Sequence, residues 1–186
     1  MIELQLTALA KARVWFGRAT PEFVASGTVN RRVEGNPTSA ARLGDLTLEA
    51  YVPRGGRAEY GLLGFHFVRD GANQLQVNVP YTEGGGVPWL DSLAAQVDDV
   101  RLELPREFAV PILDAVAGFA AHGFPAGTLT VVEAAHGQVG SSEEFFRRIA
   151  VCALSLMLDD SEREPKNMAA FLMEGLMGTG EVHRHR

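Results

Sequence analysis

Apolar and polar residues alternate along most of the first 83 residues, a period of two that is typical of β-strands with one buried face. A turn-forming Asp-Gly pair lies in residues 69–73, between two alternating segments, and predicts a hairpin there. We therefore expect antiparallel strands in this half of the chain. The expected strands cover residues 2–6, a segment around Val29 and Val33, and residues 46–52, 63–67 and 75–79.

Helical spacing replaces this alternation in the second half of the chain. A short helix is predicted over residues 88–96, with a strand through Val100 and Leu104 after it. A longer helix is predicted from Glu107 until Gly123, a residue type that commonly ends helices. Pro111 has no amide hydrogen to donate, so we expect it in the opening turn of that helix, and a strand at 128–132 follows.

A second long helix is predicted after Ser141 and Ser142, because either hydroxyl can accept a hydrogen bond from an unpaired amide of the first turn. Its apolar stripe contains Cys152, the one cysteine of the chain, which we expect to be a buried core residue. An acidic stretch then ends the helix. These elements indicate one domain over residues 1–158 and a separate C-terminal segment over residues 159–186.

The net charge of −6 argues against a general nucleic-acid binder, so no DNA partner is expected. The first 60 residues nevertheless hold eight basic and six acidic side chains, which leaves room for a local basic patch or for an ordinary mixed surface. No secretory leader is visible, and no apolar stretch approaches the roughly 18 residues that a membrane helix needs. We expect a cytoplasmic protein without a membrane partner.

Few residues are arranged for catalysis. The chain has no phosphate-binding loop, and its lysines, Lys11 and Lys166, lie outside any such motif, so neither binding nor hydrolysis of GTP is expected. The acidic pair Asp98-Asp99 is interpreted as a turn, since neighbouring strand residues point to opposite faces. Ser141 and Ser142 are better explained as helix caps than as nucleophiles. We predict no catalytic residue, no metal site and no cofactor.

Three motifs occur in a fixed order along the chain: Gly55-Gly56-Arg57-Ala58-Glu59-Tyr60-Gly61, Leu104-Pro105-Arg106-Glu107-Phe108 and Gly140-Ser141-Ser142-Glu143-Glu144-Phe145-Phe146. Together they resemble domain IV of the translation elongation factor G family, and the match spans about residues 21–155. The resemblance implies an α+β fold of the ribosomal protein S-five domain 2-like type. That fold has a mixed, mostly antiparallel sheet, two main helices on one face and a left-handed βαβ crossover.

By the same resemblance, two loops should meet at a tip that contacts the ribosome or structured RNA. Carried over by position, this tip would contain Gly55, Gly56, Arg57 and His136. Arg31, Arg32 and Arg54 are near in sequence and could add phosphate contacts. The chain departs from the family pattern at Gly140, where an Asp is usual, and the loop from His136 is one residue longer.

The C-terminal segment is apolar and rich in methionine, so it either covers the protein's own core or contacts a protein partner or a second copy of the chain. Three function classes remain open. They are a translation-associated RNA-binding module, a protein-interaction module that kept the fold, and an unrecognised small-molecule enzyme. The partner residues predicted in the segment are Met168, Phe171, Leu172, Met173 and Leu176.

Overall fold

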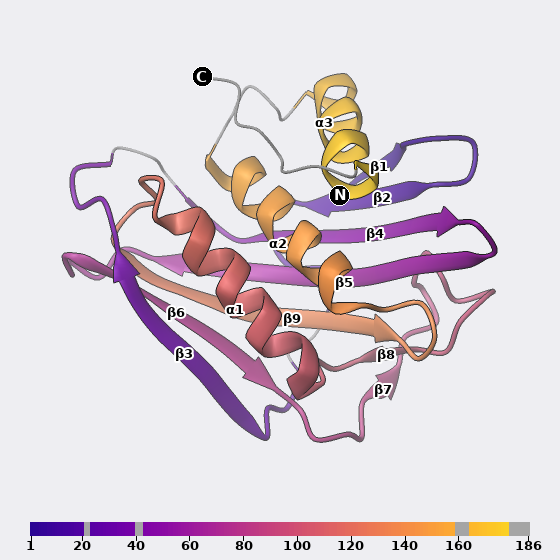
Figure 1. Ribbon diagram of the computed structural model, residues 1–186, viewed down its shortest axis with the longest axis horizontal. Coiled ribbons are helices and arrows are strands. Elements are labelled where there is room, and N and C mark those ends of the chain that lie inside the picture. The colour runs from indigo at the N-terminus through magenta and orange to yellow at the C-terminus, as the bar shows by residue number, and fades with distance from the viewer. Residues whose placement is uncertain (21–22, 40–42, 159–163, 179–186) are drawn as a thin grey trace.

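The computed structural model describes residues 1–20, 23–39, 43–158 and 164–178 (Figure 1). The acidic stretch predicted to end the second long helix falls largely outside these ranges. The described chain forms β1 (Ile2–Gln5), β2 (Lys11–Trp15), β3 (Gly27–Glu34), β4 (Leu46–Arg54), β5 (Arg57–Val68), β6 (Gln74–Tyr81), β7 (Val87–Pro88), β8 (Val100–Leu102), α1 (Arg106–Ala120), β9 (Gly127–Gly137), α2 (Glu143–Leu158) and α3 (Pro165–Met177).

The strands form one sheet, whose main path has the order β1-β2-β4-β5-β9-β6-β3. Along this path β6 and β9 run parallel, and the other neighbouring strands run antiparallel. β7 and β8 form a short antiparallel ladder that joins the end of β9. The predicted α+β class with a mixed, mostly antiparallel sheet is therefore confirmed.

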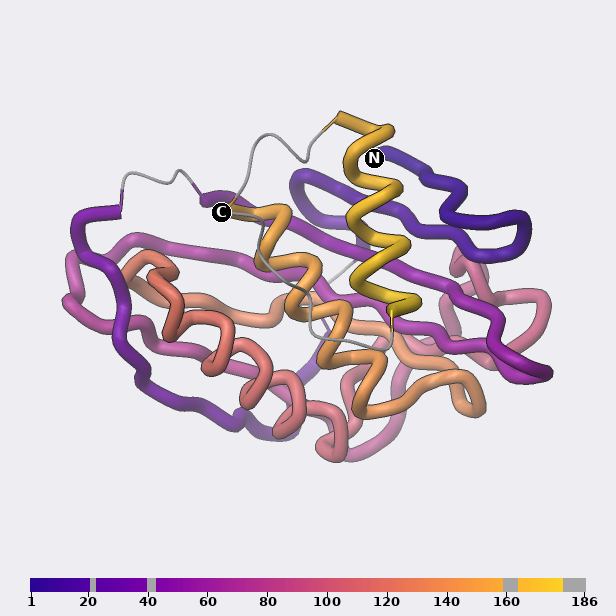
Figure 2. Tube along the Cα trace, turned by 45° about the horizontal axis from the view of Figure 1, so that its top comes forward, coloured from indigo at the N-terminus to yellow at the C-terminus, as the bar shows by residue number. Residues whose placement is uncertain are grey.

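Helices α1 and α2 cover one face of the sheet, and α3 lies beside α2 near β1 (Figures 1 and 2). The two long helices meet through their apolar stripes, where the rings of Phe108 and Phe146 lie 4.8 Å apart between centroids. This layer is the main core of the protein. Its fully buried side chains include Leu48, Val52, Leu63 and Phe65 from the sheet and Ile112, Val116, Phe145, Ile149, Cys152 and Leu156 from the helices.

Helix α1 differs from the prediction at its start. It begins at Arg106, so Pro111 lies in the second turn and gives up a backbone hydrogen bond to the carbonyl of Glu107. The helix continues through this position because its apolar stripe stays buried against the sheet. The predicted end is confirmed, since α1 stops at Ala120 and Gly123 adopts a φ of 101°.

The predicted hairpin at residues 69–73 is wrong, because β9 lies between β5 and β6. The local turn chemistry does form, since the carboxylate of Asp70 accepts a hydrogen bond from the amide of Ala72 at 3.0 Å. The hydroxyl of Thr128 at the start of β9 donates to the same carboxylate at 2.7 Å. β9 extends past the predicted residues 128–132 because its later residues pair with β5 up to Ala135 and then with β8.

The opposite face of the sheet is covered by irregular chain instead of the helix predicted over residues 88–96. Turns occupy most of this segment, and Ala94 packs in a small cluster with Tyr60 and Leu62. The amide of Leu93 donates to a sheet carboxylate in place of a helical carbonyl. Tertiary contacts of this kind outweigh the weak helix preference of so short a segment.

Helix α3 packs into the core through part of its apolar surface. Met168, Leu172 and Leu176 are fully buried and belong to the same cluster as α1 and α2. Phe171 is partly buried against that cluster, and Met173 is 42% exposed. Of the two roles open for this segment, the packing favours covering the protein's own core.

Candidate binding site at the sheet tip

The Gly55-Gly56 motif forms the turn between β4 and β5. Arg54 pairs with Arg57 across the ladder, which leaves the two glycines as a two-residue connection. Their φ values of 51° and 90° lie in the left-handed region that such hairpin turns require, and glycine adopts this region without strain. The turn is exposed and presents the side chain of Arg57 to solvent.

The loop between β9 and α2 lies beside the start of β5 and is held there by hydrogen bonds. The carbonyl of Gly140 accepts from the amide of Tyr60 at 2.8 Å, and the amide of Gly140 donates to the carboxylate of Asp98 at 2.7 Å. The hydroxyl of Ser141 accepts from the amide of Gly137 at 2.9 Å and donates to the carbonyl of Tyr60 at 2.7 Å. The two loops therefore meet at one end of the sheet, which we call the tip.

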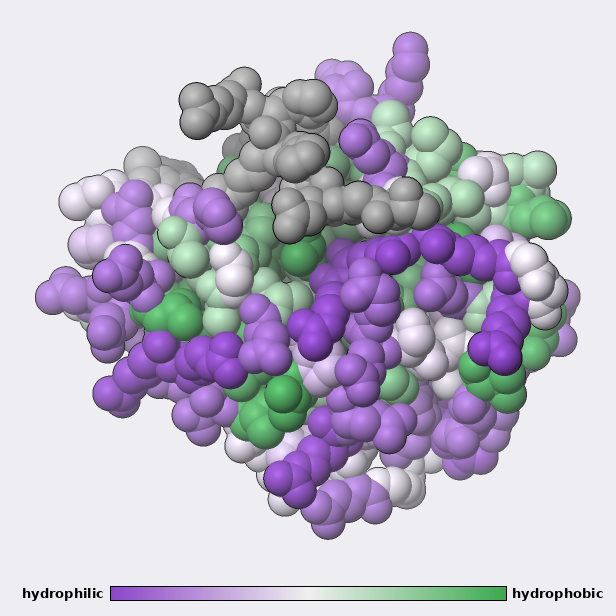
Figure 3. Space-filling model, in the orientation of Figure 1, coloured by the Kyte–Doolittle hydropathy of each residue, from purple (hydrophilic) through white to green (hydrophobic). Residues whose placement is uncertain are grey.

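An open groove of about 570 Å³ lies at the tip, between these loops, the β1–β2 turn and residues 94–98. Three of its aliphatic side chains project into solvent, with exposed fractions of 68% for Leu9, 64% for Val97 and 87% for Val139. Hydrophobic surface is visible at this right-hand end of the molecule in Figure 3. A shallow apolar groove suits contact with another macromolecule better than enclosure of a small molecule.

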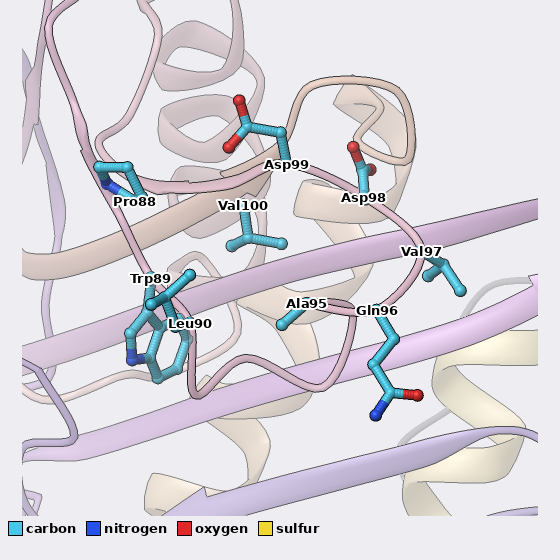
Figure 4. A pocket seen from close by; sticks show the side chains of 9 residues that line it. All are labelled: Pro88, Trp89, Leu90, Ala95, Gln96, Val97, Asp98, Asp99 and Val100. Carbon is cyan, nitrogen blue, oxygen red and sulfur yellow. The ribbon is translucent and has the colours of Figure 1, made fainter.

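A second hollow, of about 480 Å³, continues the groove along the irregular segment (Figure 4). Val97 and Asp98 line both hollows. Trp89 and Leu90 form the far side of the second hollow, and Leu90 is 85% exposed. The apolar surface of the tip thus extends toward the start of the segment that covers the opposite face.

The basic side chains predicted for the tip do not all remain available there. Arg54 forms an ion pair with Glu59 at 3.0 Å and donates to the carbonyl of Leu176 at 2.9 Å, so it connects the turn to α3. Arg57 lines the groove and is exposed. Lys11 is the first residue of β2 and pairs with Tyr51, and Tyr51 also lines the groove. The tip thus has modest basic character.

Arg31 and Arg32 lie away from the tip, on the edge strand β3, which is separated from β5 by β9 and β6. Arg31 forms an ion pair with Asp114 of α1 at 2.8 Å. Arg32 donates to the amide oxygen of Gln76 at 2.9 Å. Their closeness to Arg54 in sequence therefore does not become closeness in space, and the predicted set of four arginines is not one surface.

His136 lies near the tip but is buried beneath the start of α1. Its side chain is 8% exposed and packs edge-on against Phe108, with ring centroids 5.9 Å apart. Its Nε2 atom is 3.6 Å from Oε1 of Glu103, and burial lowers its pKa despite this carboxylate. A neutral, buried histidine does not present a phosphate contact, so we assign His136 to the core of this region.

A buried carboxylate that the sequence reasoning missed lies on the opposite face. Glu49 is fully buried, and its Oε1 accepts from Tyr60 at 3.1 Å and from the amide of Leu93 at 2.7 Å. Its Oε2 has no hydrogen-bond partner and lies 3.6 Å from the guanidinium of Arg13. Burial raises the pKa of Glu49 to about 7. Glu49 occupies a polar position in the alternating pattern of its strand, and that pattern alone suggests a side chain that faces solvent.

Glu133 is a second fully buried carboxylate on that face. It accepts hydrogen bonds from the amides of Ala19 and Thr20, at 3.1 Å and 2.7 Å, and from the hydroxyl of Thr47. These bonds fasten the loop after β2 to the sheet. Glu133 accepts mainly from backbone amides of irregular chain, and Glu49 accepts from one such amide and from the phenol of Tyr60, which indicates structural roles.

The other candidate residues also have structural explanations. The hydroxyl of Ser142 accepts from the amide of Phe145 at 3.2 Å and so caps α2, as predicted. Asp98 binds the amides of Val139 and Gly140, a loop-fastening role that agrees with its assignment to a turn. Burial raises the pKa of the Cys152 thiol to about 12, which makes it unreactive at neutral pH.

The described residues contain no group of three or more metal-ligating side chains and no helix that is long and apolar enough to cross a membrane. Comparison with known proteins adds no assignment: no family model matches the chain, and no curated protein matches it significantly. The functional conclusion therefore rests on the geometry of the tip.

Proposed function

We propose that the protein is a non-catalytic binding module that contacts a protein partner through the groove at the tip. The observation that carries the proposal is the exposure of Leu9, Val97 and Val139, which come from three separate segments around one groove. The segments of Val97 and Val139 are held together by hydrogen bonds from the loop amides to Asp98. A preorganised apolar patch favours binding because little conformational entropy is lost on contact.

We also propose that the module has the elongation factor G domain IV-like, ribosomal protein S-five domain 2-like fold. In Figure 1, β6 and β9 both point to the right, β9 lies above β6, and α1 passes in front of the sheet between them. A connection of this form is left-handed. Because nearly all βαβ connections are right-handed, this rare sense supports the resemblance more strongly than the fold class alone.

A second candidate function is binding to the ribosome or to structured RNA through the same tip. The observation that favours it is the exposure of Arg57, the first residue of β5 after the glycine turn, with Lys11 on a neighbouring strand. A cytoplasmic location accompanies either candidate. So few basic side chains would contact only a small number of phosphates. Removing one of these cations should reduce the slope of the logarithm of the binding constant against the logarithm of salt concentration by close to one unit.

The test compares three variants in affinity capture from native lysate, with and without RNase. Val97→Asp combined with Val139→Asp places charges in the groove, and Arg57→Ala removes the exposed cation. The control is Val68→Asp, since Val68 is 44% exposed at the other end of β5. Partners that survive RNase and are lost only with the groove variant support the protein contact.

Other results of this capture would change the conclusion. Partners that disappear with RNase and weaken with Arg57→Ala support the RNA candidate instead. If the groove variant and the control retain the same partners, the tip is not the binding surface.

A further inference from the structure

Residues 89–98 cover the sheet as a unit that is separate from the main core. Figure 4 shows this segment as an irregular loop in front of the strands. Trp89 and Ala94 belong to a small apolar cluster around Tyr60, which is distinct from the cluster beneath the helices. A unit with few buried apolar contacts can open while the rest of a protein stays folded. The segment is therefore a candidate for local opening.

A buried carboxylate holds this segment to the sheet. Oε1 of Glu49 accepts hydrogen bonds from the amide of Leu93 at 2.7 Å and from the phenol of Tyr60 at 3.1 Å. The guanidinium of Arg13 donates to the carbonyl of Asp91 at 2.7 Å and lies 3.6 Å from Oε2 of Glu49. Two backbone groups of the segment are thus bound by one cluster of side chains from β2, β4 and β5.

The ionised form of Glu49 is poorly accommodated while the segment is closed. The side chain is fully buried, and among the described residues its Oε2 has no hydrogen-bond partner. The titratable groups that face it are Arg13 of β2, Tyr60 of β5 and Asp91 of the segment. Arg13 is shared with Glu3 of β1 at 3.0 Å, and burial raises the pKa of Tyr60 well above its usual range. A shared cation offsets only part of the cost of burying a charge.

Opening of the segment gives Glu49 access to water. Water solvates a carboxylate far better than a buried site does, so loss of the proton favours the open form. The same segment supplies Val97 and Asp98 to the groove at the tip. Asp98 also holds the β9–α2 loop through the amides of Val139 and Gly140. Opening would therefore remove one wall of the groove.

We propose that residues 89–98 form a proton-controlled flap, which is closed over protonated Glu49 and opens when Glu49 loses its proton. The open form lacks the groove wall, so a partner at the tip binds the closed form more tightly and is released as the pH rises. This consequence rests on the function proposed above, whereas the opening is a property of the chain alone. The raised pKa of Glu49, about 7, places the transition near neutral pH.

Amide hydrogen exchange of the full chain labelled with ¹⁵N tests the flap. The amides of Leu93, Val97 and Asp98 report on the segment, because they are hydrogen-bonded to Glu49 or to a carbonyl of the segment. The amide of Ile149, in the buried stripe of α2, reports on unfolding of the whole chain. Exchange rates are corrected for the intrinsic effect of pH and are measured with increasing urea below the unfolding transition.

We expect the protection of the segment amides to fall by at least about tenfold between about pH 5.5 and pH 7.5. Their exchange should depend only weakly on urea, because a local opening exposes little surface, whereas urea should strongly accelerate exchange at Ile149. The ¹³C signal of the Glu49 carboxylate gives a second measurement that needs no variant. The fall in protection should level off at the pH at which this signal titrates.

Glu49→Gln and Glu3→Gln are the matched variants. Glu49→Gln removes the titrating group and should abolish the loss of protection with rising pH. Glu3→Gln makes the same change in a half-exposed partner of Arg13 and should retain that loss. The titration of His136 of β9 affects all three proteins alike, so the difference between them reports on Glu49.

Three outcomes would overturn the proposal. The first is segment protection that does not change with pH in the wild type, and the second is a change that persists in Glu49→Gln or is lost in Glu3→Gln. The third is exchange of Leu93 with the same urea dependence as Ile149, which would mean that the segment opens only with the whole fold. Because the experiment uses the chain alone, a tip that binds no partner contradicts the proposed function without affecting this result.

Discussion

The two faces of the sheet are covered in different ways. Beneath α1 and α2 the contacts are almost entirely apolar, and regular helices carry stripes that match the strands. On the opposite face irregular chain does the covering, and it is fastened by the buried carboxylates Glu49 and Glu133. The same strands supply both surfaces, because successive side chains point to opposite faces.

This difference shows how segments without regular structure can be held in place. A helix satisfies most of its own backbone groups, so only shape and apolar area are needed to dock it. An irregular segment brings unpaired amides to the sheet, and buried acceptors must meet them. Glu133 meets the amides of Ala19 and Thr20, and Glu49 meets the amide of Leu93. On this face, specific hydrogen bonds hold the covering segments in place, whereas on the helical face the close packing of apolar side chains does so.

The largest effect is expected on the helical face. Phe146 is fully buried and packs on Phe108, so Phe146→Ala should lower the free energy of unfolding by about 3–5 kcal/mol. Urea denaturation followed by circular dichroism measures this change. Val68→Ala is the control, since Val68 is 44% exposed and should lose less than about 1 kcal/mol. Similar losses for the two variants would show that the helical face is not the main source of stability.

Glu133→Gln tests the polar fastening of the opposite face. The substitution keeps the size of the side chain but replaces one acceptor with a donor, so hydrogen bonds to Ala19, Thr20 or Thr47 must be lost. We expect a loss of about 1–3 kcal/mol and faster exchange of the Ala19 and Thr20 amides.

Glu34→Gln is the matched change at an exposed position and should alter stability by less than about 0.5 kcal/mol. Unchanged protection of the two amides in the Glu133 variant would mean that the loop is held by other contacts.

Glu49 should make the stability depend on pH. Its pKa is raised from 4.5 to about 7 in the folded protein, so the folded state retains a proton that the unfolded state loses. The contribution of this proton to the free energy of unfolding is present in full below pH 4.5 and is lost as the pH rises through about 7. The slope should approach about 1.4 kcal/mol per pH unit between these limits.

Urea denaturation of the wild type and of Glu49→Gln across pH 5–8 measures this dependence. The free energy of unfolding of the variant should no longer fall with rising pH through this group. Near pH 8 the variant should be more stable than the wild type, because it carries no buried charge at this position. His136 acts in the opposite sense, since its lowered pKa removes stability as the pH falls. The difference between the two proteins therefore isolates Glu49, and parallel curves would refute the assignment.

Local signals explain which predictions about the site and the helices were confirmed. The Gly55-Gly56 turn, the Ser142 cap and the end of α1 at Gly123 depend on residues that are close in sequence. The burial of Cys152 follows from the period of a single helix. Interactions of this range are visible in the order of residues alone.

The placement of Arg31 and Arg32 and the path of β9 could not be predicted in this way. A strand pattern identifies two faces but not the neighbours of the strand, so β9 was not expected between β5 and β6. The same limit put Arg31, Arg32 and Arg54 in one predicted surface. Their separation depends on pairings between strands that are distant in the chain.

The sequence by itself determined the α+β class and the long helices, because hydrophobic periodicity acts over a few residues. Only the tertiary structure decided that residues 88–96 lie as irregular chain over a buried Glu49 and that α3 joins the core. Alternation predicts that one side of a strand is polar, but whether water or another segment covers that side depends on the whole fold. The free energy of burying a carboxylate is set by the amides that reach it, and here those amides come from distant parts of the chain.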